Sequence, residues 1–303
     1  MKKPLLIPIL LFLFSSMAPG YAPEEAFFPY GPLMDRLAQD GFDADFLSRL
    51  FTDPRAEAIP ELMTLPLTSR ETTDLYAPFL TKESILSART FLRKNQERLC
   101  QTEERFGVEK EIIVAILLVE SRFGENIGRR RVLPTLASIA LTSSMDNLQR
   151  TYQTLQESEP EASYELLEMM AKRRADWAYR ELKCFLQIIR HEKMDPLEVK
   201  GSYAGALGMA QFLPSSYLAY ALNDKSFEIW LSSKEAAFVS IGNYLKSNGW
   251  KRGLSPERKR QVLWSYNRSA PYGETILQLE QALKSKPARP SPPKRKPPLP
   301  KSP

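Results

Sequence analysis

Histidine and cysteine are scarce in this chain of 303 residues: His191 is the only histidine, and Cys100 and Cys184 are the only cysteines. This scarcity argues against zinc sites, histidine-based catalytic triads, iron–sulfur clusters and disulfide-rich scaffolds. Any chemistry must then depend on carboxylates, hydroxyls or amides, and we expect neither a metal nor a cofactor. Two separate thiols are the favoured interpretation of the cysteines, and a disulfide between them stays an alternative.

The apolar run at the start of the chain is too short to cross a bilayer, which takes about 20 residues as a helix. Leu5–Phe14 follows Lys2 and Lys3 and precedes small residues up to Gly20, which is the order of a secretory signal peptide. We predict a signal peptide over residues 1–20, with an uncleaved short anchor as the alternative. The protein is then exported to the periplasm or cell envelope. Because no cysteine lies near the cleavage region, we do not expect a lipoprotein.

Acidic residues are absent from segment 286–303, which holds six basic residues and eight prolines. Such a composition favours a solvated, disordered tail. Its charge equals the formal net charge of +6, so the rest of the chain is close to neutral and no nucleic-acid partner is indicated. One interpretation is a tether to an anionic envelope polymer or membrane surface. The other is a tail without a dedicated partner.

Helical periodicity dominates the region between these two ends. The stretches that predict helices lie near 33–50, 82–105, 109–120, 134–156, 161–192, 214–222, 234–248 and 274–284. Strand signals are sparse, and no internal period indicates a repeat protein. The sequence therefore predicts a mainly α fold.

A carboxylate follows the most apolar of these stretches. Gly107 interrupts the helical pattern, and a new helix is predicted to begin near Glu109. This helix continues through Ile112–Val119, eight consecutive apolar residues, to Glu120. Desolvation at the end of a buried helix disfavours an ionised carboxyl group, as a general acid requires. The alternative is a salt bridge of Glu120 that closes a structural helix.

Three glycines within eight residues distinguish the segment Lys200–Ser216. Glycine allows close backbone approach, and Ser202 and Gln211 supply neutral hydrogen-bonding groups that suit a sugar. The segment matches neither common phosphate-binding glycine pattern. Tight helix packing is the alternative explanation. Later in the chain, Tyr266 and Asn267 add an aromatic ring and an amide.

In their order and spacing, these elements resemble the lytic murein transglycosylases, and most closely the membrane-bound lytic transglycosylase B family. The segments that carry the resemblance are Gly107–Gly124, Lys172–Asp176, Asp195–Ser202, Gly205–Ser216, Asn248–Trp250 and Tyr266–Asn267. The resemblance implies a lysozyme-like α domain with additional helices, and makes residues 21–285 the catalytic region. It also implies cleavage of the MurNAc-β-1,4-GlcNAc bond of peptidoglycan without water, which leaves 1,6-anhydromuramoyl ends.

The resemblance implies roles for individual side chains. Glu120 falls on the position of the single catalytic acid/base. The positions that correspond to substrate-binding residues are Ser202, Gln211, Tyr266, Asn267, Arg173, Arg174 and Tyr244. The two arginines resemble those near the stem peptide or the muramic lactyl group, and Tyr244 resembles a wall of the cleft. Peptidoglycan glycan strands are the expected partner.

Two features depart from the family pattern. Segment 223–230, where many relatives have a calcium loop, lacks alternating acidic ligands and contains Lys225, so we expect no calcium site. The interval from Glu120 to Arg173 is longer than usual in the family. Its excess predicts an inserted helical hairpin at about 142–170, which covers the cleft, alters substrate choice, binds a partner or merely packs at the periphery.

Two other functions remain compatible with these residues. A hydrolytic muramidase on a similar fold would leave reducing ends instead of anhydro ends, and would need a polar group to position water. A noncatalytic peptidoglycan-binding scaffold would keep the cleft without turnover. The retained carboxylate at Glu120 argues against the scaffold.

Overall fold

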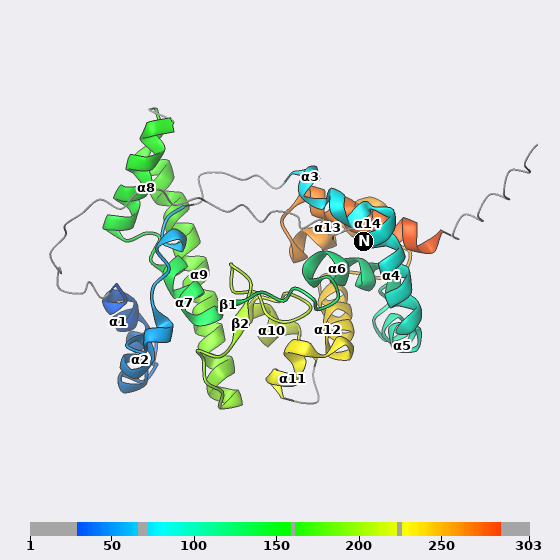
Figure 1. Cartoon of the computed structure of the whole chain (residues 1–303), viewed down its shortest axis with the longest axis horizontal. Helices are drawn as coiled ribbons and strands as arrows, with labels where there is room; N and C mark the ends of the chain where they lie inside the picture. Colours follow the sequence, from blue (N-terminus) through cyan, green and yellow to red (C-terminus); the bar gives the residue numbers. More distant parts are fainter. Residues whose placement is uncertain (1–28, 66–71, 159–160, 223–225, 286–303) are drawn as a thin grey trace, which may run out of the picture.

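The computed structural model describes residues 29–65, 72–158, 161–222 and 226–285 (Figure 1). The predicted signal peptide at 1–20 and the predicted basic tail at 286–303 lie outside these ranges. So do residues 223–225, where we compared the sequence with a calcium loop. These expectations remain predictions from the sequence.

Helices form almost all of the regular secondary structure in the described residues, which confirms the predicted mainly α class. The α-helices are α1 (Gly31–Gln39), α2 (Ala44–Phe51), α3 (Thr73–Tyr76), α4 (Lys82–Lys94), α5 (Gln96–Phe106), α6 (Lys110–Ser121), α7 (Val132–Ala140), α8 (Met145–Ser158), α9 (Tyr164–Glu192), α10 (Pro214–Tyr220), α11 (Phe227–Ser232), α12 (Lys234–Ser247), α13 (Pro256–Tyr266) and α14 (Ala270–Lys284). Short 3-10 turns are η1 (Pro54–Ala56), η2 (Pro60–Leu62) and η3 (Ala77–Leu80). Two strands, β1 (Arg130–Arg131) and β2 (Lys200–Gly201), pair antiparallel.

The helices gather on two sides of the molecule (Figure 1). Helices α1, α2, α7, α8 and α9 lie on one side, and α3 to α6 with α12 to α14 lie on the other. Helix α10 lies between them and packs against both α9 and α12. The strand pair β1–β2 also lies between the two sides.

Helix α6 is the central helix of its side. Its residues Ile112–Leu117 are completely buried, and α14, α4, α5 and α12 pack around it. A helix that is apolar on all faces is stable in water only when neighbours cover it on all faces. The eight-residue apolar run in the sequence therefore explains why α6 lies inside the fold, and why its last turn brings Glu120 out of the core.

The longest helix, α9, begins at a cap in which the Ser163 side chain accepts a hydrogen bond from the Leu166 backbone N–H. Its first turns and α8 form a hairpin that projects from the molecule (Figure 1). The Tyr152 and Tyr164 rings meet edge to face across this hairpin, with centroids 5.1 Å apart. The hairpin occupies the range 142–170, where we predicted an insertion, and its role stays a prediction.

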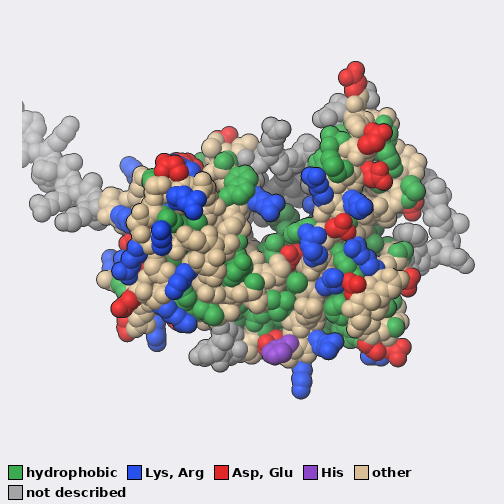
Figure 2. All heavy atoms as spheres, turned by 180° about the vertical axis from the view of Figure 1, so that it is seen from behind, with side chains coloured by type: hydrophobic (Ala, Val, Ile, Leu, Met, Phe, Trp, Pro, Cys, Tyr) green, Lys and Arg blue, Asp and Glu red, His purple; other side chains and the backbone are tan. Residues whose placement is uncertain are grey.

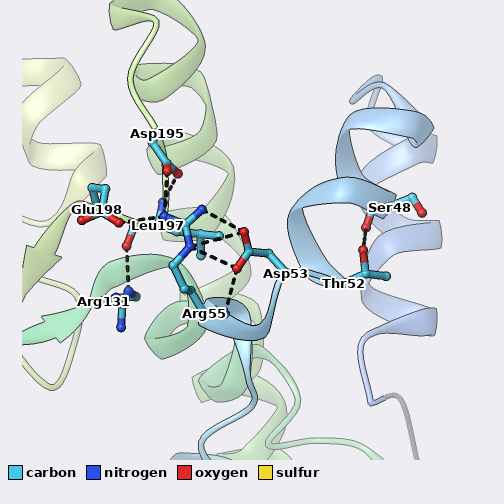
Figure 3. A network of polar contacts seen from close by, with 8 residues as sticks. All are labelled: Ser48, Thr52, Asp53, Arg55, Arg131, Asp195, Leu197 and Glu198. Atoms are coloured by element: carbon cyan, nitrogen blue, oxygen red, sulfur yellow. Dashed lines mark hydrogen bonds and ion pairs between the residues drawn. The ribbon is translucent and has the colours of Figure 1, made fainter.

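Two polar contacts connect parts that are distant in sequence. The buried Glu181 side chain of α9 accepts hydrogen bonds from the Ser215 backbone N–H at 2.9 Å and from its hydroxyl at 2.8 Å. This carboxylate thus caps the N-terminus of α10. The second contact is made by Arg55, whose side chain donates to Asp195 and Glu198 at 2.8 and 2.7 Å (Figure 3). These bonds attach the N-terminal segment to the loop that leads to β2.

Several helix boundaries differ from the predicted stretches. The predicted helix 82–105 is two helices, because Asn95 interrupts it. Helix α13 was not predicted, since its surface positions are highly charged and only Lys259, Val262 and Leu263 are buried. Cys100 and Cys184 are free thiols. None of the helices in the described ranges combines the length and the apolar character needed to span a membrane.

Candidate active site

A cleft of about 870 Å³ separates the two sides of the molecule. Its lining residues are Glu120, Asn126, Gly128, Arg129, Arg130, Trp177, Gly201, Ser202, Tyr203, Ala204, Ala206, Gln211, Leu213, Ser265, Tyr266, Asn267 and Arg268. Figure 2 shows the surface hollowed between the two sides, with Lys and Arg side chains on both edges of the hollow. Five of the eight predicted site residues therefore meet in one place: Glu120, Ser202, Gln211, Tyr266 and Asn267.

Glu120 reaches the cleft from the last turn of α6 and is partly buried. The chain turns sharply after it, because Arg122 and Phe123 have left-handed backbone with φ of 49° and 62°. The buried Ser121 hydroxyl donates to the Met209 carbonyl at 2.8 Å. This bond ties the end of α6 to the glycine-rich segment and fixes the carboxylate relative to the opposite side of the cleft.

Backbone contacts orient the Ser202 and Gln211 side chains. The Ser202 oxygen accepts from the Ala204 and Ala206 N–H groups at 3.1 and 3.0 Å, so its own proton is available for donation to a ligand. The Gln211 amide nitrogen donates to the Gly208 and Ile127 carbonyls at 2.8 and 3.2 Å. Two carbonyl acceptors identify that atom as nitrogen, and the side-chain oxygen of Gln211 is then the group that can accept from a ligand.

Tyr266 and Asn267 end helix α13 at the cleft. The Tyr266 hydroxyl donates to the Ala210 carbonyl at 2.6 Å. Burial raises the pKa of Tyr266 well above its usual range, and the nearby charge of Glu120 adds to the effect. Tyr266 is therefore a neutral hydrogen-bond donor at physiological pH, held against the glycine-rich segment beside the carboxylate.

Tyr272 is a residue that the sequence analysis missed. It is buried at the start of α14, and its ring stacks on Tyr266 with centroids 6.4 Å apart. Burial raises the pKa of Tyr272 well above its usual range, and interaction with the Glu120 carboxylate raises it further. Tyr76 meets the same ring edge to face at 6.1 Å. Nothing in the sequence distinguished these tyrosines from ordinary core aromatics.

The other three predicted residues do not line the cleft. Arg173 is exposed on α9, and Arg174 is half-buried there, with its Nε atom buried and lacking a hydrogen-bond partner in the described structure. Burial lowers the pKa of Arg174, although the nearby Tyr203 opposes this shift. Tyr244 is buried behind Tyr266, with the two ring centroids 4.9 Å apart. It supports the cleft wall instead of forming its surface.

The charges around the cleft are unequal. Glu120 is the only acidic residue among the described residues that line it, whereas Arg129, Arg130 and Arg268 contribute three cations. In the parts of the chain that the structure describes, no group of three or more His, Cys, Asp or Glu side chains is placed to hold a metal ion. The arrangement suits a single proton-transferring carboxylate surrounded by hydroxyl and amide groups.

Comparison with known proteins identifies the family. Residues 30–260 match the family described as Transglycosylase SLT domain. The membrane-bound lytic murein transglycosylase B of Escherichia coli (strain K12) is 32% identical over 178 residues, which are 58% of this chain but 41% of that protein. This chain thus matches less than half of the length of its curated relative.

Solved structures of lytic transglycosylases share the fold. The soluble lytic transglycosylase SltB1 from Pseudomonas aeruginosa superimposes with a TM-score of 0.65 at 24% identity, over 83% of this chain and 97% of that one. SltB3 from Pseudomonas aeruginosa, crystallised with NAG-NAM-pentapeptide, gives 0.64 at 19% identity, over 85% and 80%. The resemblance found in the sequence motifs is confirmed, and the chain belongs to the Transglycosylase SLT domain family.

Proposed function

We propose that this protein is a peptidoglycan lytic transglycosylase that cleaves the MurNAc-β-1,4-GlcNAc bond and leaves 1,6-anhydromuramoyl ends. The observation that carries the proposal is the position of Glu120, which emerges from a buried helix as the single acidic residue among the described lining of the cleft. Family membership and the 32% identity to a lytic murein transglycosylase support it.

A single carboxylate favours a substrate-assisted reaction. Retaining and inverting glycosidases of the common kind use two carboxyl groups, one on each side of the bond. Here protonated Glu120 donates its proton to the glycosidic oxygen as the C1–O bond breaks, while the 2-acetamido group of the muramoyl residue stabilises the anomeric carbon. The resulting Glu120 carboxylate then takes the proton of the C6 hydroxyl, and the C6 oxygen bonds to C1. Glu120 is protonated again, and no water is consumed.

The neighbouring side chains have roles that follow from their hydrogen bonds. Ser202 can donate a hydrogen bond to the substrate, because its oxygen already accepts from backbone N–H groups. The side-chain oxygen of Gln211 can accept from the substrate, because its amide nitrogen already donates to backbone carbonyls. Asn267, directly after α13, offers an amide to the same cleft. The stacked rings of Tyr266 and Tyr272 lie near the Glu120 carboxyl group. Neutral groups of this kind can orient a carboxyl group by hydrogen bonds while favouring its ionised form less than a neighbouring cation would.

The relatives support the substrate and the location. SltB3 was crystallised with a NAG-NAM-pentapeptide, a fragment with the saccharide and peptide that we propose as substrate here. The Escherichia coli relative is described as membrane-bound. Together with the predicted signal peptide, this supports export to the periplasm or cell envelope, where peptidoglycan lies.

The test is digestion of purified peptidoglycan, with mass spectrometry of the released fragments. We expect the protein without residues 1–20 to release anhydro-ended fragments, and Glu120→Gln to fold normally and release none, because an amide cannot donate and regain the proton. Glu125→Gln is the matched control: that carboxylate is exposed, five residues further on, and outside the cleft lining.

Other products would contradict the proposal. Reducing ends would identify a hydrolytic muramidase, because the two products differ by one water. Binding to peptidoglycan without any product would identify a scaffold. Activity of Glu120→Gln near that of the original protein would remove Glu120 from its proposed role.

A further inference from the structure

Arginines border the cleft on both of its walls. Arg129 lies in the loop just before β1, and Arg268 follows the end of α13 on the opposite side. Both side chains are exposed. A saccharide ring carries no charge that would explain cations at these positions, so the arginines point to another part of the substrate.

Arg129 and Arg268 differ from the third arginine of the cleft in their partners. Arg130 forms an ion pair with Glu61 at 3.1 Å. Within the described ranges, neither the Arg129 nor the Arg268 guanidinium has an ion-pair or hydrogen-bond partner. The pair with Glu61 occupies part of the Arg130 guanidinium, whereas an unpaired arginine keeps all five N–H donors for a ligand.

The guanidinium group selects for a particular anion. Its planar fork of N–H donors matches the two oxygens of a carboxylate. Because the guanidinium is weakly hydrated, the replacement of its water by a carboxylate costs little desolvation free energy. The same lining contains Trp177 and the 72% exposed Tyr203, which present aromatic surfaces to the cleft. The cleft therefore combines aromatic faces for a sugar ring or an aliphatic chain with a carboxylate-binding group.

We propose that Arg129 and Arg268 bind the carboxylates of the peptide stems on the glycan strand, so that the protein selects strands with charged stems. The inference rests on the proposed function, because it assigns a substrate feature to the same cleft. It concerns two residues outside the family motifs quoted above. The net positive cleft also attracts such a strand before contact.

The experiment measures binding, so that it does not depend on turnover. The probe is a tetrasaccharide of GlcNAc and MurNAc with peptide stems, either with free stem carboxylates or with those carboxylates amidated. Calorimetry with Glu120→Gln, which we expect not to cleave the probe, gives Kd for each form. Arg129→Ala and Arg268→Ala are then introduced singly and together in this background. Arg93→Ala is the control, because Arg93 is an exposed arginine on α4 outside the cleft lining.

We expect the free-carboxylate probe to bind more tightly than the amidated probe. Each alanine substitution should weaken the free form about fivefold, the upper range for a solvent-exposed ion pair, and leave the amidated form unchanged. The double variant should lose the preference, and Arg93→Ala should keep it. Because exposed charges are screened, 0.5 M salt should also remove the preference.

Two outcomes would overturn the inference. One is equal binding of both probe forms by the Glu120→Gln protein. The other is an equal loss of affinity for both forms in the arginine variants, which would make the two residues general glycan contacts. Either result leaves the anhydro product of the digestion assay unaffected, whereas failure of the proposed function would abolish that product and leave the binding preference intact.

Discussion

Substitution of Lys259 by methionine tests how α6, the helix whose last turn holds Glu120, is kept in place. The Lys259 ammonium is buried between two carboxylates, Glu109 at 2.7 Å and Glu280 at 2.5 Å. Glu109 precedes the first turn of α6 and also accepts from the Trp250 indole N–H at 2.8 Å. One cation on α13 thus joins the start of α6 to α14.

The structure sets the magnitude of the expected loss. Removal of one partner of a buried ion pair costs about 3–5 kcal/mol, because the remaining charge stays buried without compensation. Here Glu109 would keep its bond from Trp250, and Glu280 would keep Lys284 at 2.6 Å. These remaining partners place the expected decrease in the free energy of unfolding near the lower limit, about 3 kcal/mol at pH 7.

The pH dependence gives the prediction a second signature. Burial disfavours the charged form of Glu109, but hydrogen bonds from Lys259, the backbone and Trp250 outweigh this and lower its pKa. In the unsubstituted protein, this contribution to stability is present above the unfolded pKa and is lost as the pH falls through the lower folded pKa. Without Lys259, the largest of these hydrogen bonds is lost while the burial remains, so the Glu109 carboxylate is protonated more readily. The difference in stability between the two proteins should therefore shrink as the pH falls from 7 toward 4.

Urea unfolding followed by circular dichroism measures both effects. With a slope of about 3 kcal/mol per molar urea for a domain of this size, the midpoint of Lys259→Met should fall by about 1 M at pH 7. The triple variant in which Glu109 and Glu280 are also changed to glutamine should recover part of the loss. A Lys259→Met protein as stable as the original at pH 7 would refute the reasoning, as would a difference that grows at low pH.

Two further substitutions probe the cleft itself. Gly128 has a φ of +90°, and a Cβ atom there would come within 2.0 Å of the Gly201 carbonyl oxygen. Gly128→Ala should therefore separate β1 from β2 and lower the melting temperature by several degrees, which a thermal melt measures. It should also reduce turnover in the digestion assay. Tyr272→Phe removes only a buried hydroxyl beside Glu120, so it should lower kcat more than it changes KM while the far-ultraviolet spectrum stays the same; an unchanged kcat would show that the hydroxyl has no influence on the acid.

The sequence predicted those features that depend on local patterns. The apolar run before Glu120 is long enough to identify a buried helix and the point where it ends, and the structure has α6 there. The resemblance then indicated which distant residues would join Glu120, and Ser202 and Gln211 do line the same cleft. No rule of periodicity could have brought these segments together, since their contact depends on the whole fold.

Other features depend on contacts that a sequence pattern does not contain. Arg173 and Arg174 are neighbours in the chain, yet successive residues point about 100° apart around a helix, and only Arg174 is half-buried near Tyr203. Tyr244 is an aromatic residue of a type that often lines a sugar-binding cleft, but it is buried behind Tyr266. Helix α13 escaped prediction because its buried stripe is too narrow to give a clear period.

The short helix α10 has a mechanical consequence. It is the one helix between the two sides that packs on both α9 and α12, and its N-terminus is fixed to α9 by Glu181. The contact between α10 and α9, which follows directly on Leu213 of the cleft lining, therefore contributes to the spacing between the cleft walls. We therefore expect changes at Glu181 or Ser215, neither of which lines the cleft, to alter the width of the opening without replacing a lining residue. The width of ligand that the cleft admits can therefore change in evolution while Glu120 and its neighbours in the lining are retained.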